Sequence, residues 1–255
     1  MNPNPAAAGI GAVLLDIEGT TTPIAFVTQV LFPHARTHLR SHLERHARSP
    51  AYETLFAAFR EEHAADSLRG EPVPSWADEP ESARVMAVAA YAEWLMDRDR
   101  KSPPLKDLQG RIWDDGYRRG ELAGEVFPDV PGALRRWQER QLPVGIFSSG
   151  SVQAQQLLFG HSTAGDLTPL LRWYFDTRVG AKIEPDSYRT IALAMGLPAH
   201  SILFVSDVTR ELSAARAAGM KVRLSVRPGN PLQPDAHEFE VARSFDGLLD
   251  RIGGF

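Results

Sequence analysis

The sequence predicts an α/β protein, with a Rossmann-like parallel sheet and a helical domain inserted after its first strand. Three observations support this class. A short apolar run at residues 10–15 ends abruptly in Asp16-Ile17-Glu18-Gly19, as strands buried on both faces do. Residues 25–125 then follow a helical period. After Phe127-Pro128-Asp129, short apolar runs alternate with helical stretches, which indicates βαβ units on a parallel sheet.

The hundred-residue helical stretch shows apolar residues at the three- and four-residue spacing of one helix face. Successive stripes begin at Tyr52, at Val85 and at Leu105. A loop at residues 70–80 holds three prolines and separates the helices. Because the first strand cannot be buried alone, we assign it to the later sheet and treat the stretch as an insertion. The expected division is a core of 9–24 plus 126–255, an inserted helical domain at 25–125 and a disordered lead at 1–8.

Strands and helices alternate regularly in the second half of the chain. Apolar runs predict strands at 144–147, 173–175, 202–205 and 222–226, and helical periods predict helices at 131–140, 152–159, 186–195 and 210–218. Three glycines follow predicted helix ends, and glycine favours the left-handed conformation that closes a helix. We therefore expect Gly160 to be such a cap, with Gly196 and Gly219 ending the next two helices.

Composition excludes several classes of protein. The 255 residues carry 28 Lys and Arg against 32 Asp and Glu, for a net charge of -4, so no global attraction to nucleic acid or anionic lipid is expected. With no cysteine, disulfides, thiolate nucleophiles and Cys-based metal sites are absent. The sequence shows neither a membrane span nor a secretory signal. We expect a cytoplasmic protein with no membrane or nucleic-acid partner.

Polar side chains stand where the predicted strands end. Ligands of doubly wound sheets bind beyond the carboxyl ends of the strands, so these side chains are expected to converge on one edge. They are Asp16 and Glu18 after the first strand, Ser148 and Ser149 after the second, Lys182 in the loop after 173–175, and Asp207 after 202–205.

This set of residue types suits magnesium-assisted phosphoryl transfer. Phosphate esters are anions, so a carboxylate nucleophile needs a cation beside it, and hard oxygen ligands hold Mg²⁺. Asp16 is the expected nucleophile, forming an aspartyl-phosphate, and Asp16, Asp207 and Glu18 are the expected metal ligands. The hydroxyls of Ser148 and Ser149, with the helix amides after them, are expected to bind phosphoryl oxygens. Lys182 would add a positive charge where transition-state charge develops.

The same motifs resemble a known family. Asp16-x-Glu18-Gly19-Thr20, Ser148, Lys182 and Ser206-Asp207 are similar to the four ordered motifs of the haloacid dehalogenase (HAD) superfamily. Within it the chain looks most like the bifunctional enolase-phosphatases of methionine salvage. The segments that carry this closer likeness are 16–21, 147–152, 158–162, 206–211 and 226–230. The inserted helical domain is similar to that superfamily's cap in position, length and helical character.

The resemblance implies the reaction, the cofactor and the oligomeric state. It implies enolisation of 2,3-diketo-5-methylthiopentyl-1-phosphate, a small phosphate ester, followed by hydrolysis to an acireductone, with one Mg²⁺ per subunit and a monomeric enzyme. One position departs from most phosphatases of the superfamily, which have Asp where this chain has Glu18, as enolase-phosphatases do. Glu18 is therefore a candidate catalytic acid or base as well as a metal ligand, with a cap residue as the rival base.

Each motif taken singly has a structural interpretation. Asp16 could initiate an Asx turn, Ser148 or Asp207 could cap a helix, and most isolated lysines are surface residues. Their joint placement after predicted strands, in the superfamily's order, favours function. A non-catalytic scaffold would not need this set, and a serine hydrolase, a dinucleotide enzyme and a P-loop ATPase lack their glycine motifs. Another capped phosphatase or a metal-independent dehalogenase of the superfamily stays open.

One pattern lies outside this scheme. Histidines recur every fourth residue over 34–46, so a helix there would carry them as one ridge. Histidines four apart on a helix can bind zinc. Four arginines, Arg36, Arg40, Arg45 and Arg48, lie in or just after the segment, and Glu44 is its only carboxylate. A solvated face is therefore the favoured interpretation, and a metal site the alternative. The four histidines are His34, His38, His42 and His46.

Overall fold

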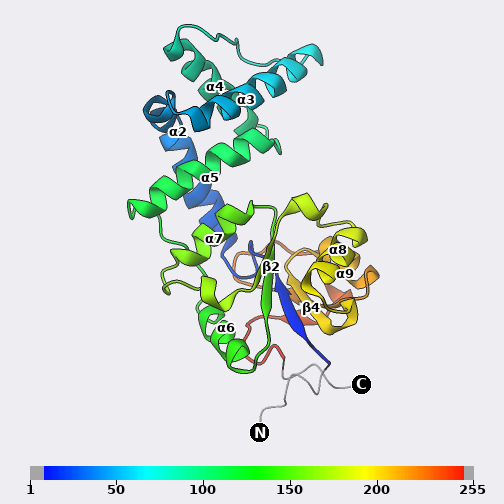
Figure 1. Ribbon diagram of the computed structural model, residues 1–255. Helices are drawn as coiled ribbons and strands as arrows, with labels where there is room; N and C mark the ends of the chain where they lie inside the picture. Colours follow the sequence, from blue (N-terminus) through cyan, green and yellow to red (C-terminus); the bar gives the residue numbers. More distant parts are fainter. Residues whose placement is uncertain (1–8, 250–255) are drawn as a thin grey trace. The chain divides into compact units, whose positions relative to one another are not determined.

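A computed structural model describes residues 9–249 of the chain (Figure 1). The predicted disordered lead at 1–8 lies outside these residues. The described chain forms two compact units, one of residues 9–28 with 122–249 and the other of Gln29–Glu121. Within residues 9–249, no helix has the length and apolar character needed to cross a membrane.

The first unit is built on a parallel sheet of six strands in the order β3-β2-β1-β4-β5-β6. The strands are β1 (Ala12–Leu15), β2 (Val144–Phe147), β3 (Trp173–Phe175), β4 (Ile202–Ser206), β5 (Lys221–Ser225) and β6 (Val241–Ala242). The central strand β1 pairs with β2 and with β4, and Leu15 lies opposite both Ile146 and Val205. The three strands therefore end together at one edge of the sheet.

Helices cover both faces of this sheet. They are α6 (Val130–Glu139), α7 (Val152–Gly160), α8 (Pro185–Met195) and α9 (Thr209–Ala217). Figure 1 shows α8 and α9 on one side of the sheet and α6 and α7 on the other. Every residue of β1, β2 and β4 is buried, which explains why these strands are continuously apolar rather than alternating. One core cluster joins Leu14 and Phe204 of the sheet to Tyr188 and Leu212 of the helices.

The second unit is helical. Its helices are α2 (Phe32–His46), α3 (Pro50–Leu68), α4 (Glu81–Met96) and α5 (Pro103–Arg118). A short α1 (Ile24–Phe26) of the first unit and a π-helical segment (Val27–Leu31) precede α2 in the chain. Proline occupies the first turn of α3 and of α5, where its missing N–H costs nothing. The Ser102 hydroxyl caps α5 by accepting from the Leu105 N–H at 3.2 Å. The predicted stripes are buried within this unit, with Phe59, Val88 and Leu108 each fully enclosed.

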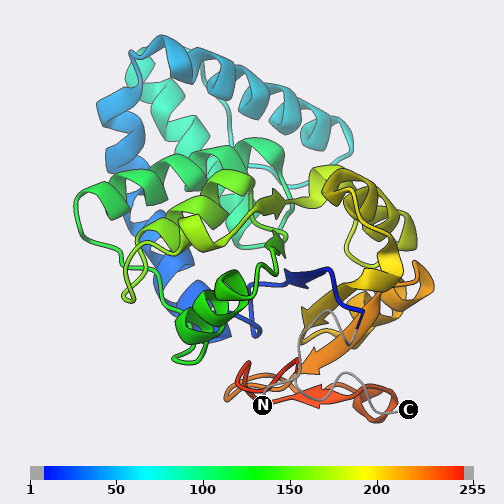
Figure 2. The same ribbon diagram turned by 60° about the horizontal axis from the view of Figure 1, so that its bottom comes forward.

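The α/β class and most predicted elements are confirmed, and two details differ. Gly160 is not a left-handed cap, because its φ is not positive. At this end of α7 the Leu157 carbonyl accepts from both the backbone N–H and the Nδ1 of His161, at 3.0 and 3.2 Å. Gly196 does end α8 in the left-handed conformation, at φ 68°. The sequence did not predict β6, which is two residues long and pairs with β5 at the edge of the sheet (Figure 2).

Candidate active site

Asp16 and Lys182 form the centre of a buried charged cluster. Asp16 directly follows β1, and its side chain is 6% exposed. The Lys182 ammonium lies 2.6 Å from Oδ1 of Asp16 and 2.7 Å from Oε2 of Glu211. Burial lowers the pKa of Lys182, but the two carboxylates outweigh it and raise that pKa above its ordinary value. Lys182 is therefore a permanent cation between two acids.

Neighbouring groups fix the Asp16 carboxylate in one orientation. Its Oδ1 accepts from the Ile17 N–H at 2.7 Å, and its Oδ2 accepts from the Ser206 hydroxyl at 3.3 Å. Ser206, the last residue of β4, is also 2.8 Å from Oε2 of Glu211. Oδ1 already has two close donors, whereas Oδ2 has one long contact. Oδ2 therefore keeps lone pairs for a further partner.

The loop that carries Lys182 is held in place by side chains of α8. Tyr188 donates its hydroxyl to the Lys182 carbonyl at 2.7 Å, and Ser187 donates to the Ala181 carbonyl at 2.7 Å. Both side chains belong to the first turns of α8. The ammonium is thus positioned by a rigid helix although the lysine itself is in a loop.

Asp207 adds a third acid to the cluster. It follows β4 and is 5% exposed. Burial, with the charges of Asp16 and Glu211, raises the pKa of Asp207 to about 7. Burial and Asp16 likewise raise the pKa of Glu211 to about 7. Three buried carboxylates thus face one ammonium, an imbalance that disfavours full ionisation.

The turn after β1 passes very close to Asp207. Gly19 adopts φ +68°, and a Cβ at this position would lie 2.4 Å from Oδ2 of Asp207 and 2.9 Å from Oδ1 of Asn230. No side chain fits into this space, so glycine is required both for conformation and for contact. Asn230 donates Nδ2 to the Gly19 carbonyl at 2.9 Å, while its buried Oδ1 has no hydrogen-bond partner among the described residues.

A buried ion pair between Arg227 and Asp129 holds the same turn after β1. Arg227 is 5% exposed, and its two Nη atoms donate to the two carboxylate oxygens of Asp129 at 3.0 and 2.9 Å. Its Nε donates to the Thr20 carbonyl at 3.3 Å. Asp129 also accepts from the Phe245 N–H. This network links the turn after β1 to Asp129, just before α6, and to the segments that follow β5 and β6.

The remaining predicted site residues are Ser148, Ser149 and Glu18. Ser148 follows β2, is 3% exposed, and its Oγ accepts from the Gly150 N–H at 3.2 Å. Ser149 is half-buried beside it. Ser148 does not cap α7, because Ser151 does so by accepting from the Ala154 N–H. Glu18 is half-buried in the turn after β1, bridged to Thr22. Direct contacts therefore join Asp16 to Lys182, and the acid charges couple Asp207 to them.

Sequence reasoning missed Glu211 as a member of the site. Its carboxylate contacts Lys182 and Ser206 directly. A signal was available, because Glu211 follows Asp207 by four residues, one helical turn, at the start of α9. The Arg227–Asp129 pair was also missed, and since 98 residues separate its members, nothing local could indicate it.

The donor set fits a divalent metal ion. Asp16 and Asp207 offer carboxylate oxygens, the ligands that Mg²⁺ prefers. Three buried acids against one buried lysine leave an excess of negative charge that a dication would neutralise. Two buried threonine hydroxyls of the adjacent turn, Thr20 Oγ1 and Thr22 Oγ1, also have no hydrogen-bond partner among the described residues.

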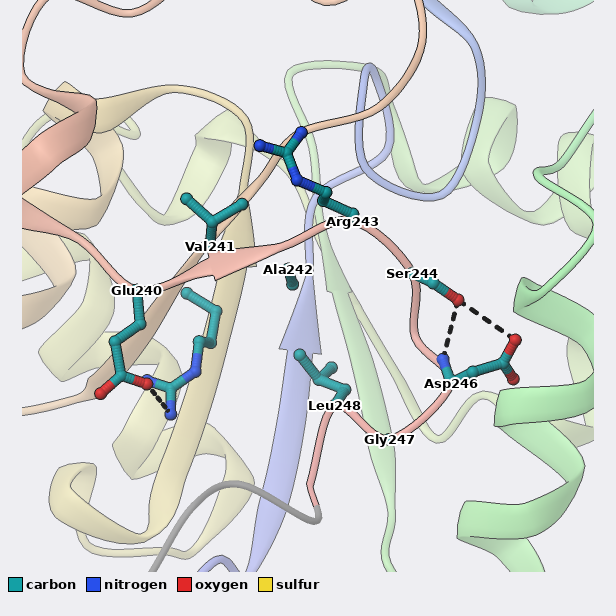
Figure 3. A pocket seen from close by; sticks show the side chains of 9 residues that line it. Glu240, Val241, Ala242, Arg243, Ser244, Asp246, Gly247 and Leu248 are labelled. Atoms are coloured by element: carbon teal, nitrogen blue, oxygen red, sulfur yellow. Dashed lines mark hydrogen bonds and ion pairs between the residues drawn. The ribbon is translucent and has the colours of Figure 1, made fainter. Parts of the chain in front are cut away.

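A separate hollow of about 570 Å³ lies at the edge of the sheet formed by β5 and β6 (Figure 3). It is lined by Arg223, Glu240, Val241, Ala242, Arg243, Ser244, Asp246, Gly247 and Leu248. None of the predicted site residues belongs to it. Its charged groups are already paired in part, since Arg223 contacts Glu240 and Arg136 contacts Asp246. It therefore lacks the chemistry of the cluster at Asp16.

The fold and this cluster are those of a haloacid dehalogenase-like hydrolase, and comparison with known proteins agrees. The sequence model of the family described as haloacid dehalogenase-like hydrolase matches residues 10–219. "Enolase-phosphatase E1" of Synechococcus elongatus is 47% identical over 244 residues, covering 96% of this chain and 100% of that protein. "Enolase-phosphatase E1" of Pseudomonas syringae pv. syringae is 47% identical, covering 88% of this chain and 92% of that protein.

A solved structure agrees with these sequence relatives. The crystal structure of the UTR4 protein of Saccharomyces cerevisiae superposes with a TM-score of 0.75 at 31% sequence identity, covering 93% of this chain and 99% of that one. The chain therefore belongs to the haloacid dehalogenase-like hydrolases and, within them, to the enolase-phosphatase family. The resemblance seen in the strand-end motifs is confirmed. Enzymes of this kind generally use Mg²⁺.

Proposed function

We propose that this chain is an enolase-phosphatase that converts 2,3-diketo-5-methylthiopentyl-1-phosphate to the acireductone 1,2-dihydroxy-3-keto-5-methylthiopentene, first enolising the diketone and then hydrolysing the phosphate ester. Two relatives named enolase-phosphatase, each 47% identical, support it. The observation that carries it is the buried Asp16 carboxylate, held by Lys182 at 2.6 Å and by Ser206 at 3.3 Å.

Asp16 is the proposed nucleophile. A carboxylate oxygen would attack phosphorus and displace the ester oxygen, giving an aspartyl-phosphate that water then hydrolyses. The fixed orientation lowers the entropic cost of attack, since the carboxylate does not have to be ordered when the substrate arrives. The Lys182 ammonium, 2.6 Å from Oδ1, would hold this carboxylate in place for the attack.

Mg²⁺ is the proposed cofactor, one per subunit, held by Asp16 and Asp207, with Glu18 as a further ligand candidate. When bound, it would polarise a carbonyl for enolisation and offset the charge of the phosphoryl group. Gly19 leaves the space beside Asp207 that a Cβ would fill. The oxygen of Asn230 that has no hydrogen-bond partner borders the same space.

Phosphate binding is proposed for the hydroxyls of Ser148 and Ser149 and for Lys182. Ser148 lies beyond β2, the neighbour of β1, so the parallel register places it at the same sheet edge as Asp16. Hydroxyls and the amides that begin α7 donate to anionic oxygens. Lys182 would stabilise negative charge that grows on the phosphoryl oxygens during transfer.

Enolisation needs a base that removes a proton from C1 of the substrate. We propose Glu18 for this step or for protonation of the leaving oxygen, with a residue of the inserted helical domain as the alternative base. We further propose that residues 25–125 act as a cap on a core of 9–24 plus 126–255. Such a cap would exclude water from the enol intermediate. A cytoplasmic monomer completes the proposal, and light scattering tests its oligomeric state.

The decisive test is anaerobic ultraviolet spectroscopy with the diketo phosphate, with phosphate release followed in parallel. An enol absorbance should rise before acireductone accumulates, and both signals should vanish in excess EDTA. Asp16→Asn, nearly isosteric, should abolish phosphate release, while the exposed control Asp186→Asn in α8 should retain it. Hydrolysis of simple monoesters without any enol signal would leave a phosphatase of another specificity. Turnover that persists in excess EDTA would refute the metal-dependent scheme.

A further inference from the structure

The histidine ridge of α2 divides into two clusters that differ in chemistry. His34 and His38 approach Glu121, and one ligand atom from each of the three lies within 4.8 Å of the others. His42 and His46 approach Asp115 in the same way. All of these residues belong to the helical unit Gln29–Glu121. The question is which cluster has free ligand atoms.

The second cluster is already saturated. His42 is buried, with Nδ1 2.9 Å from Oδ2 of Asp115 and Nε2 hydrogen-bonded to the Tyr52 hydroxyl. Both ring nitrogens are therefore in use. Asp115 is further contacted by Arg45 and by Nε2 of His46, at 3.6 and 3.5 Å. This cluster is a hydrogen-bond network that fastens α2 to α5 rather than a metal site.

The first cluster has nitrogen lone pairs to spare. Nδ1 of His38 lies 2.9 Å from the His34 carbonyl, and because a carbonyl only accepts, Nδ1 must carry the proton. In the neutral ring, Nε2 then holds a lone pair, and it lies 3.8 Å from Oε2 of Glu121. Nε2 of His34 is enclosed and has no hydrogen-bond partner among the described residues. The Nε2 of His38 and the Oε2 of Glu121 are thus acceptors 3.8 Å apart, and His34, the third member of the cluster, has an unpartnered Nε2 among the described residues.

Supporting contacts match those of a built metal site. The His38 Nδ1–H to carbonyl bond is the usual device that fixes the ring of a metal-binding histidine. Glu121 is itself oriented by Arg119, whose Nη2 donates to Oε2 at 3.0 Å. Ligating carboxylates are commonly held in this way.

The arginines in and just after α2 do not block this cluster, although their number argued against a metal site. Each is drawn toward a carboxylate elsewhere: Arg36 contacts Asp97, Arg40 contacts Glu44, Arg45 contacts Asp115 and Arg48 contacts Glu81. Arg119 is then the one cation that acts on both His34 and Glu121 through the contacts described.

We propose that His34, His38 and Glu121 bind one transition-metal ion, with Zn²⁺ the favoured species, independently of the catalytic cluster. Two imidazoles and a carboxylate, with an open fourth position, are a typical zinc donor set. Tetrahedral bonds near 2.0–2.1 Å place ligand atoms about 3.3 Å apart, so small side-chain rotations bring this triad to that geometry. The ion would join the first turn of α2 to the last residue of the helical unit.

The test is zinc binding by full-length protein without a polyhistidine tag, in excess Mg²⁺ to occupy the catalytic cluster. A chromogenic chelator competes for Zn²⁺, and Co²⁺ serves as a spectroscopic probe of histidine ligation. His38→Ala and Glu121→Gln alter half-exposed side chains, 30% and 40% exposed, so both variants should fold. The matched control is His46→Gln, on the same helix and in the same four-residue repeat.

Wild type should bind one equivalent of Zn²⁺ at this site. His38→Ala and Glu121→Gln should bind that equivalent at least tenfold more weakly. Zn²⁺ should also raise the melting temperature of wild type and of His46→Gln, but not of His38→Ala. Equal binding by wild type and His38→Ala would overturn the proposal. A loss confined to His46→Gln would overturn it as well, by placing the site at the other cluster.

Discussion

Replacing Lys182 by Met tests the charge balance of the catalytic cluster most directly. Met keeps the length and apolar stem of the side chain but removes the ammonium. That ammonium lies 2.6 Å from Asp16 and 2.7 Å from Glu211, and the lysine side chain is 10% exposed. The variant therefore leaves Asp16, Glu211 and the neighbouring Asp207 as buried acids without their cation.

Two estimates of the stability loss agree. Removing one partner of a buried ion pair costs about 3–5 kcal/mol. The loss is limited because an unpaired acid can take up a proton instead. Protonating one carboxylate of ordinary pKa costs about 4 kcal/mol at pH 7.5 and about 1.5 kcal/mol at pH 5.5. We expect Lys182→Met to lower the free energy of unfolding by about 3–4 kcal/mol at pH 7.5, and by less than half of that at pH 5.5.

Urea unfolding followed by circular dichroism, in EDTA at both pH values, measures this loss. The exposed Lys101→Met should change stability by less than about 0.5 kcal/mol. Adding Glu211→Gln to Lys182→Met should recover part of the loss, since one unpaired acid is removed. A loss below about 1 kcal/mol at pH 7.5, or the same loss at both pH values, would refute the charge-balance argument.

Three further outcomes follow from the same geometry. Asp207 has a pKa raised to about 7 in the folded protein, so the folded state holds its proton longer than the unfolded state does. In EDTA, wild type should lose about 2–3 kcal/mol relative to Asp207→Asn between pH 5 and pH 8, and a flat difference in urea titrations would contradict this. Gly19→Ala would place a Cβ 2.4 Å from Oδ2 of Asp207. It should weaken Mg²⁺ binding at least tenfold by calorimetry, and unaltered affinity would show that the turn can yield. Arg227→Met strands the buried Asp129 carboxylate and should cost about 3–5 kcal/mol in urea unfolding, whereas a loss under 1 kcal/mol would mean that the pair contributes little.

The fold class and the site's first members were predictable because they depend on local pattern. A strand buried on both faces must be continuously apolar, so β1, β2 and β4 were visible as short runs. Parallel strands share one carboxyl edge, and this rule predicted that Asp16 and Asp207 lie at the same edge of the sheet. The helix end at Gly196 was visible because a left-handed residue is nearly always glycine.

Partners from distant parts of the chain were decided only by the tertiary structure. Ser206 meets Asp16 across 190 residues, and Arg227 meets Asp129 across 98. Charge pairing acts through space, so no sequence spacing encodes it. The two-residue β6 is likewise too short to carry a periodic signal and exists because β5 offers it hydrogen bonds. Gly160 likewise does not adopt the left-handed conformation that its place in the sequence predicted.

The amino-acid order alone thus determined the strands, through their hydrophobic pattern, and predicted which residues at their carboxyl ends perform phosphoryl chemistry. It could not distinguish one histidine of α2 from another, because all four repeat at the same interval. Packing made that distinction by giving His42 two hydrogen-bond partners and leaving Nε2 of His34 with none among the described residues. A nitrogen's lone pair is free or occupied according to its neighbours in space, and only the folded chain supplies those neighbours.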